Sequence, residues 1–305
     1  MADKSTMITI TTCPICNSNH FKAFIKCEDF TVSRETFTIQ ECSNCTFKFT
    51  NPRPADNDLG KYYQSTAYIS HSGTKEGFVN KVYHLVRNYT LKQKVKLINT
   101  YDQYKTSKYV LDIGCGSGHL LNALQKNSIK CFGLEPDEQT RQTAIKNFRL
   151  DIHPSEHLFS INAESVTTVT MFHVLEHVGN LNEYLSAIHS ILKPNGTFIV
   201  AVPNYQSSDA LHYDQLWAAY DVPRHLNHFS AETITQLASN NNFKLSKILP
   251  MHFDGFYVSM LSEKYKGNKG LLGLLLGALQ GLVTFLKSLG RVKQSSSLIY
   301  IFKNI

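Results

Sequence analysis

The chain has 305 residues and a formal net charge of +7, with 42% hydrophobic and 18% charged residues. This balance excludes a mainly disordered chain, and the length suggests about two domains. The positive charge would suit nucleic acid or an anionic membrane, but Lys and Arg are spread along the chain, so an evenly solvated surface is the simpler interpretation.

The first residues, MADKSTMITITTC, do not form a basic segment followed by an apolar one, so we expect no secretory signal. A cytoplasmic, reducing location follows as the expectation. The seven cysteines are then expected to be metal ligands or buried thiols instead of disulfides.

Four cysteines form two C-x-x-C pairs, Cys13 with Cys16 and Cys42 with Cys45. Two such pairs can close a tetrahedral four-sulfur site that leaves no position for water. We therefore predict a structural zinc ribbon over residues 1–53, with a redox or disulfide role as the alternative. Cys27, between the pairs, is interpreted as a bystander. A unit this small would depend on its metal to fold.

Residues 54–108 follow a breaker-rich stretch, NPRPADND, and are predicted to be a helical linker that contributes to the cofactor or substrate site. The segments at 59–73 and 78–101 are expected to be its helices; the second has helical spacing without a break.

Residues 109–305 alternate between strand and helix patterns, which predicts a doubly wound, Rossmann-like α/β domain. The predicted strands lie at 109–113, 130–137, 165–174, 197–203, 243–250 and 297–302. The predicted helices lie at 119–127, 138–148, 181–196 and 230–241, and an apolar helical insert is expected within 255–296.

A glycine loop, DIGCGSG from Asp112 to Gly118, follows the first of these strands, and Glu135 ends the second. In this fold, such a loop and acid bind a nucleoside at the carboxyl ends of the strands. The G-x-G-x-G spacing differs from the G-x-G-x-x-G of dinucleotide enzymes, and Asp112 would repel a pyrophosphate. A cationic ligand, S-adenosylmethionine (SAM), fits better, and an NAD-dependent oxidoreductase is the disfavoured alternative.

The segments VLDIGCGSG and GLEPD resemble the first two motifs of class I SAM-dependent methyltransferases, and the resemblance runs from about residue 55 to the end. It implies a set of cofactor-binding residues. These are Asp112, Gly114, Cys115, Gly116, Gly118, Glu135, Pro136, His173 and Val174.

The stretch from His173 to His177 reads H-x-x-E-H, the pattern of inverted zinc metalloproteases. However, FHVLEHV resembles the signature that many small-molecule methyltransferases carry after the fourth strand, which implies that Glu176 and His177 face the substrate. Some quinone-biosynthesis O-methyltransferases bind a divalent ion at a similar E-x-x-E-H, where this chain has His173 in place of the first acid. Thr167 also replaces a usual aspartate, which we expect to affect stability more than activity.

Residues 205–233 gather aromatic, basic and histidine residues, which predicts a lid over the acceptor pocket; the alternative is that Ser230 merely caps the next helix. The segment is similar to PRHxxHFS in zinc-ribbon methyltransferases and to a loop of deoxysugar C-methyltransferases in which a histidine is the base. We expect His228, or failing that His225 or His177, to be the base. Tyr220 and Arg224 are expected to contact the substrate.

The apolar stretch 270–286 is slightly short to span a bilayer and has basic residues on both sides. Three interpretations stay open: a helix dipping into one leaflet, a dimer seam through Gly273, Gly277 and Gly281, or a lid packed on the domain. Membrane contact would favour a lipid-linked sugar or a quinone-like molecule as the acceptor.

The sequence therefore predicts a SAM-dependent methyltransferase with structural zinc, acting on a small-molecule or saccharide acceptor, at a hydroxyl oxygen with a histidine base. Two alternatives are a deoxysugar C-methyltransferase and a non-catalytic zinc-ribbon interaction protein that binds nucleotide. We expect no nucleic-acid partner, because no basic and aromatic run is present. The expected location is cytoplasmic or peripheral to the membrane, and a homodimer stays open.

Overall fold

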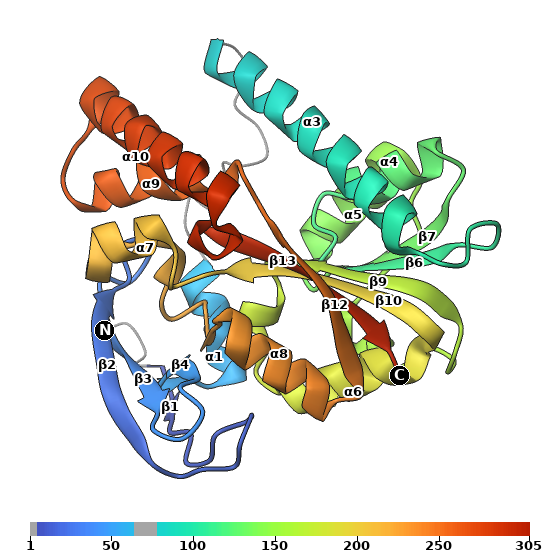
Figure 1. Cartoon of the computed structure of the whole chain (residues 1–305), viewed down its shortest axis with the longest axis horizontal. Helices are drawn as coiled ribbons and strands as arrows, with labels where there is room; N and C mark the ends of the chain where they lie inside the picture. Colours follow the sequence, from blue (N-terminus) through green and yellow to red (C-terminus); the bar gives the residue numbers. More distant parts are fainter. Residues whose placement is uncertain (1–4, 64–77) are drawn as a thin grey trace.

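The structure is a computed structural model that describes residues 5–63 and 78–305. Its centre is a seven-stranded sheet in the order β12-β13-β10-β9-β6-β7-β8, in which β13 is antiparallel to both of its neighbours (Figure 1). The strands are β6 Tyr109–Ile113, β7 Lys130–Leu134, β8 Ile152–His153, β9 Val166–Phe172, β10 Leu192–Pro203, β12 Phe243–Pro250 and β13 Ser297–Asn304. This is the doubly wound sheet that the sequence predicted.

Two strands differ from their predictions. β8 was not predicted, because it is only two residues long and pairs solely with the end of β7. β10 begins at Leu192, inside the predicted helix, because Leu192 already pairs with Val166 before a bulge at residues 193–196.

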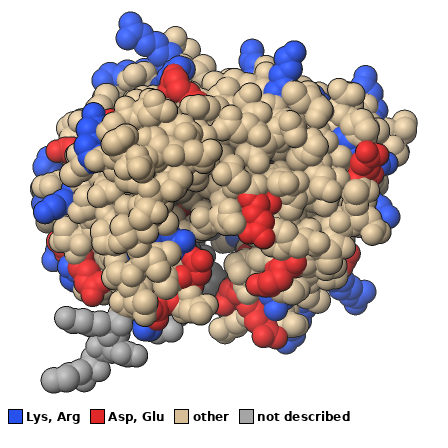
Figure 2. All heavy atoms as spheres, turned by 90° about the horizontal axis from the view of Figure 1, so that it is seen from below, with Lys and Arg blue, Asp and Glu red and all other residues tan. Residues whose placement is uncertain are grey.

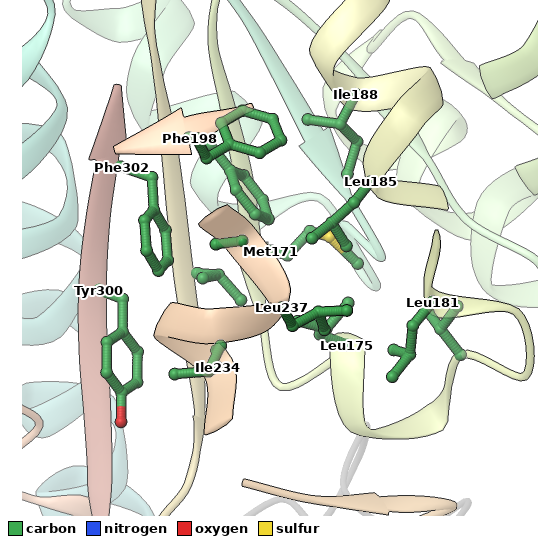
Figure 3. Packing of buried hydrophobic residues seen from close by; sticks show 14 of the residues in the cluster. Met171, Leu175, Leu181, Leu185, Ile188, Phe198, Ile234, Leu237, Tyr300 and Phe302 are labelled. Carbon is green, nitrogen blue, oxygen red and sulfur yellow. The ribbon is translucent and has the colours of Figure 1, made fainter. Parts of the chain in front are cut away.

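Helices cover both faces of the sheet. α3 Phe78–Tyr101, α4 His119–Lys126 and α5 Glu138–Phe148 lie on one face, where Ile98, Leu121 and Ala144 share a buried cluster. α6 Leu181–Ile191 and α8 Ala231–Asn240 lie on the other, and Figure 3 shows their leucines and isoleucines packed against Met171, Phe198 and Phe302 of the strands.

The N-terminal unit is a small sheet of β2 Phe21–Glu28, β3 Thr36–Cys42 and β4 Lys48–Thr50. Its fourth strand comes from the larger domain: β11 Asn227–His228 pairs antiparallel with β4. The first strand, β1 Met7–Ile8, pairs with β5 Arg53–Pro54. Phe47 and Phe49 also belong to the main buried cluster. The ribbon therefore shares a hydrophobic core with the larger domain.

The linker contains α1 Asp56–Leu59, the 3-10 turn Gly60–Tyr63 and α3, whose bounds match the predicted helix at 78–101. The rest of the helix predicted at 59–73 lies outside the described residues.

The apolar insert forms a helical hairpin of α9 Asp254–Tyr265 and α10 Gly270–Gly290. The glycine stripe of α10 faces α9: a Cβ on Gly277 would lie 2.4 Å from the Cα of Met260, and one on Gly281 would lie 2.6 Å from the Cα of Phe256. The glycines therefore let two backbones of the same chain approach, so α9 occupies the stripe that the sequence offered as a dimer seam.

The Thr167 substitution is compensated by an acid from elsewhere. The buried carboxylate of Asp102, at the end of α3, accepts hydrogen bonds from the hydroxyls of Thr167 at 2.7 Å and Thr168 at 2.9 Å. Thr167 in turn accepts from the backbone N–H of Tyr109. These bonds fix α3 to β9 and β6, which fits the expected role in stability.

Figure 2 shows one face of the molecule, with Lys and Arg scattered around the outline and acidic residues nearer the centre. On this face, the net positive charge is not gathered into one basic patch.

Candidate active site

The glycine loop turns sharply between β6 and α4. Gly114, Gly116 and Gly118 all have positive φ, at 70°, 52° and 75°, which L side chains adopt at a cost. A Cβ on Gly114 would collide with Val174, and one on Gly118 with Leu150, whereas one on Gly116 would meet nothing within 4 Å. The backbone at Gly116 is thus open to a ligand, while the other two glycines pack against the protein.

Two buried acids stand beside this loop. The backbone N–H of Gly116 donates to Glu135 Oε2 at 2.8 Å, and the N–H of Asp137 donates to Oε1 at 3.0 Å. Asp112 accepts a 2.6 Å hydrogen bond from the Thr170 hydroxyl. Burial raises the pKa of Asp112 to about 6, against the opposing effects of the Thr170 bond and Lys94. Burial also raises the pKa of Glu135.

Lys94 of α3 lies near Asp112, and the sequence did not predict it as a site residue. Its Nζ lies 3.7 Å from the ring centroid of Phe172, at the end of β9, in a cation–π contact. Burial lowers the pKa of Lys94, while Asp112 and Asp254 oppose this. Only the helical pattern of 78–101 indicated that this helix contributes to the site.

The H-x-x-E-H stretch is not helical along its length. His173 directly follows β9 with a φ of 60°, and Leu175–His177 form a single 3-10 turn. His173 Nδ1 lies 3.3 Å from Glu176 Oε1, and its Nε2 lies 4.0 Å from Asp254 of α9. Burial favours a lower pKa for His173, but Asp254 and Glu176 outweigh it and the net shift is upward. A metalloprotease needs two histidines from one helical face on one metal, and this arrangement does not provide them.

Glu176 and His177 instead meet His225 from the segment after β10. One ligand-capable atom from each of the three lies within 4.8 Å of the others, and the two imidazole centroids are 4.6 Å apart. Glu176 is 1% exposed; its Oε1 pairs with His173 Nδ1 at 3.3 Å, and its Oε2 has no hydrogen-bond partner among the described residues. Burial favours a higher pKa for Glu176, but His173, with the nearby His225 and His177, outweighs it and the net shift is downward. Buried carboxylates normally find partners, so the free oxygen of this acid can bind a cation or accept from a polar ligand.

In both histidines a backbone carbonyl holds Nδ1, and the Nε2 of His225 lies 4.0 Å from Asp221 Oδ2. His177 Nδ1 donates to the carbonyl of Arg224 at 3.0 Å, and His225 Nδ1 donates to the carbonyl of Ala219 at 2.9 Å. Because a carbonyl only accepts, each Nδ1 carries a proton, and Nε2 is the acceptor whenever the ring is neutral. Burial, with the charge of His225, lowers the pKa of His177 to about 4. The pair can accept a proton, or together with Glu176 hold a cation.

His228 is placed differently from its prediction. It lies in β11, 4% exposed, and its Nε2 donates to Thr50 Oγ1 at 3.1 Å, because that hydroxyl already donates to the carbonyl of His225. Burial lowers its pKa well below the usual value. This position joins β11 to the ribbon and does not suit the proton-accepting role that the sequence predicted.

Arg224 and Tyr220 are also inside the interface with the ribbon. Arg224 is 1% exposed, and its guanidinium binds Asp29 of the ribbon at 2.9 Å, Asp221 at 2.6 Å and the carbonyl of Tyr62 at 2.8 Å. Tyr220 is buried between Trp217 and His228. Both side chains are buried against other parts of the protein, which favours a structural role, and the predicted contact with the substrate stays a prediction. Ser230, as the alternative proposed, caps α8 in a capping box with Thr233.

The four paired cysteines converge as predicted. Cys13 and Cys45 have their sulfurs 3.5 Å apart, as do Cys16 and Cys42, and all four lie within 4.8 Å of one another. Thiolates about 2.3 Å from a tetrahedral ion would be separated by about 3.8 Å, so the geometry fits zinc. Cys27 lies in a different buried cluster.

Comparison with known proteins connects this geometry to a family. A family model described as a methyltransferase domain matches residues 83–248, which is more than half of the chain. The chain belongs to the class I SAM-dependent methyltransferase family. The match contains the glycine loop, Glu135, Glu176, His177 and His225.

Two methyltransferases illustrate the relationship. A protein assigned as a SAM-dependent methyltransferase in Mycolicibacterium smegmatis is 26% identical over 161 residues, covering 52% of this chain and 60% of that protein. The mitochondrial ubiquinone biosynthesis O-methyltransferase of Homo sapiens is 25% identical over 163 residues, covering 48% of this chain and 44% of that protein. The matches therefore span only about half the length of these relatives.

Among solved structures, a candidate sarcosine dimethylglycine methyltransferase from Galdieria sulphuraria superposes with a TM-score of 0.51. It is 11% identical and covers 82% of this chain and 98% of that one. At this identity, the methyltransferase likeness concerns the fold alone.

Proposed function

We propose that this protein transfers a methyl group from SAM to a hydroxyl oxygen of a small-molecule or saccharide acceptor, with His177 as the general base and His225 as its closest alternative. One observation carries the proposal: His177 and His225, whose Nδ1 atoms are both held by backbone carbonyls, cluster with the buried Glu176, four residues after the end of β9, the strand that pairs with β6 before the glycine loop.

The residues of the loop fit the cofactor. Gly116 leaves its backbone open, Glu135 can accept hydrogen bonds from ribose hydroxyls, and Asp112 and Glu135 give the site a negative charge that suits a cation. When bound, SAM supplies the methyl group: the acceptor oxygen bonds to the methyl carbon as the carbon–sulfur bond breaks, and S-adenosylhomocysteine is left.

His177 would take the proton that the acceptor hydroxyl loses. Its Nδ1 is held by the Arg224 carbonyl, which fixes the ring and leaves Nε2 as the nitrogen that can accept a proton. With a pKa of about 4, the ring is neutral at neutral pH but is a weak base. It is therefore better matched to an acidic hydroxyl such as a phenol than to an ordinary alcohol. Two further proposals accompany this one, a structural zinc on the four ribbon cysteines and a cytoplasmic location.

The test is a screen of hydroxylated acceptors with methyl-labelled SAM, followed by kinetics of variants on the accepted substrate. We expect His177→Ala to lower kcat by about 10²–10⁴-fold, and the exposed His212→Ala to be the matched control with wild-type turnover. His228→Ala should lower stability instead of kcat in the folded enzyme.

Three outcomes would change the proposal. Wild-type turnover in both His177→Ala and His225→Ala would exclude a histidine base at this site. A methyl group found on carbon would favour the C-methyltransferase alternative. Activity that EDTA abolishes and a divalent ion restores, with the ribbon zinc still bound, would assign Glu176, His177 and His225 to a metal instead.

A further inference from the structure

Helix α10 has an exposed face made almost entirely of leucine. In this part of the chain, which the structure describes throughout, the exposed apolar residues lie on successive turns of one helix. They are Leu271, Leu272, Leu274, Leu275, Leu276, Leu279, Leu282, Leu286 and Leu289, each between 37% and 72% exposed. Soluble surfaces rarely leave so large a contiguous apolar patch uncovered.

The opposite face of α10 is already occupied. Its small residues Gly273, Gly277, Gly281, Thr284 and Ser288 are buried, and the second and third glycines sit against the backbone of α9. Figure 1 shows α9 and α10 lying side by side, apart from the central sheet. The helix is therefore anchored to the protein on one side and bare on the other.

Basic residues stand at both ends of this leucine face. Lys264, Lys266 and Lys269 precede the helix, while Lys287 lies in its last turn and Arg291 and Lys293 follow it; all six are exposed. α10 itself contains no acidic residue. Lys293 forms an ion pair with Glu232, and the other five residues are called the basic flanks of α10.

We propose that α10 docks on an anionic lipid bilayer, lying along its surface with the leucine face among the acyl chains and the basic flanks on lipid phosphates. Apolar faces bordered by Lys and Arg bind membrane interfaces in this way. The helix is long and apolar enough to cross a bilayer by length and composition alone. However, crossing would carry α9, with Glu263 and Lys264, into the hydrocarbon, and both ends of the hairpin return to strands of one sheet.

A second copy of the chain fits this face less well. In a two-fold dimer, the same surface meets itself, so two α10 helices aligned along their length would place basic ends against basic ends. Lipid phosphates, in contrast, complement the positive charge at both ends.

The docking face is connected to the candidate active site. Asp254, at the start of α9, lies 4.0 Å from His173, and Phe253 makes an edge-to-face contact with Tyr89 of α3 at 5.5 Å between ring centroids. Docking would therefore bring the carboxyl edge of the sheet near the bilayer, and, where the proposed methyl transfer also holds, this favours an acceptor that partitions into the membrane. Only that last consequence rests on the proposed function.

The experiment is flotation of the purified full chain with vesicles of phosphatidylcholine alone and of phosphatidylcholine with phosphatidylglycerol, without SAM or acceptor. We expect flotation with the anionic vesicles. Leu275→Glu with Leu279→Glu should reduce the bound fraction by about tenfold or more, while Phe159→Glu, which alters an apolar residue 52% exposed outside the hairpin, should not. Lys269→Gln and Lys287→Gln should each weaken binding to anionic vesicles by about fivefold.

Failure of the wild-type chain to float with anionic vesicles would overturn the proposal, as would equal flotation of the double Leu variant. A stable dimer in solution that the same Leu substitutions dissociate would assign the face to a second copy. Since the assay needs no catalysis, its failure is distinguishable from a failure of the methyltransferase proposal.

Discussion

The backbone N–H of Gly116 donates to a carboxylate oxygen of Glu135 over 2.8 Å, and this bond ties the loop after β6 to the end of β7. Two residues nineteen positions apart in sequence thus lie together at the carboxyl ends of neighbouring strands. The same acid is the one expected to bind the ribose hydroxyls of the cofactor.

Replacing Glu135 should weaken cofactor binding. Hydrogen bonds to a charged group contribute about 1.5–3 kcal/mol each, so Glu135→Ala should raise the Kd for S-adenosylhomocysteine by about 10–100-fold in a titration calorimeter. Glu138→Ala, an exposed acid in the first turn of α5, is the control and should bind normally. Unchanged affinity in Glu135→Ala would place the ribose elsewhere.

The affinity for SAM should depend on the ionisation of Asp112. Because burial raises its pKa to about 6, this carboxyl gains a proton as the pH falls through that value and loses its attraction for a cation. We expect SAM to bind more weakly at pH 5 than at pH 7.5, and Asp112→Asn to bind weakly at both. The same pKa shift affects folding stability. Between about pH 4 and pH 6 the folded state keeps a proton on Asp112 that the unfolded state has already lost, so the free energy of unfolding decreases as the pH rises through this range. An Asn variant with the wild-type pH dependence would contradict this assignment.

Arg224 should contribute to the free energy of unfolding and not to substrate binding. Arg224→Ala leaves the fully buried Asp29 without its cation, and breaking a buried pair costs about 3–5 kcal/mol. Chemical denaturation should show this loss. A variant with normal stability and a raised KM would instead restore the substrate role predicted from the sequence.

Zinc should hold the ribbon and, through β11, the segment that carries His225. Cys42→Ala should abolish bound zinc, measured by elemental analysis, and lower the unfolding midpoint. The matched control is Cys27→Ala, which removes a buried thiol from a separate cluster and should retain zinc. Zinc absent from reduced wild-type protein, or retained in full by Cys42→Ala, would refute the four-cysteine site.

Replacing Thr167 by aspartate, the residue expected there from the resemblance, should lower the free energy of unfolding. Thr167→Asp would set a second buried carboxylate against Asp102, which now accepts a 2.7 Å bond from that threonine. We expect a loss of about 3 kcal/mol or more in unfolding free energy, whereas Thr167→Ser should lose about 1 kcal/mol with its methyl group. Recovery of stability in Thr167→Asp combined with Asp102→Asn would confirm the pairing, and a stable single variant would disprove it.

The parts of the molecule that local patterns determine were predictable. The glycine loop, Glu135 and six of the seven strands follow from spacing within a few residues, and so do α3 and the cysteine pairs. The roles of Arg224 and His228 were not, because they depend on β4 and Asp29, which lie more than 170 residues earlier in the chain. A basic residue and a histidine in a polar loop look alike whether they face a substrate or another strand. For the same reason, the sequence showed a glycine stripe on α10 but not that α9 would cover it.

The measurement that tests the account most directly is calorimetric titration of the purified, zinc-loaded chain with S-adenosylhomocysteine, with NADH as the control. The glycine loop with Asp112 and Glu135 predicts saturable binding of S-adenosylhomocysteine and none of NADH. Binding of neither, in a folded sample, would contradict the methyltransferase proposal and favour a non-catalytic interaction protein; binding of NADH alone would favour an oxidoreductase.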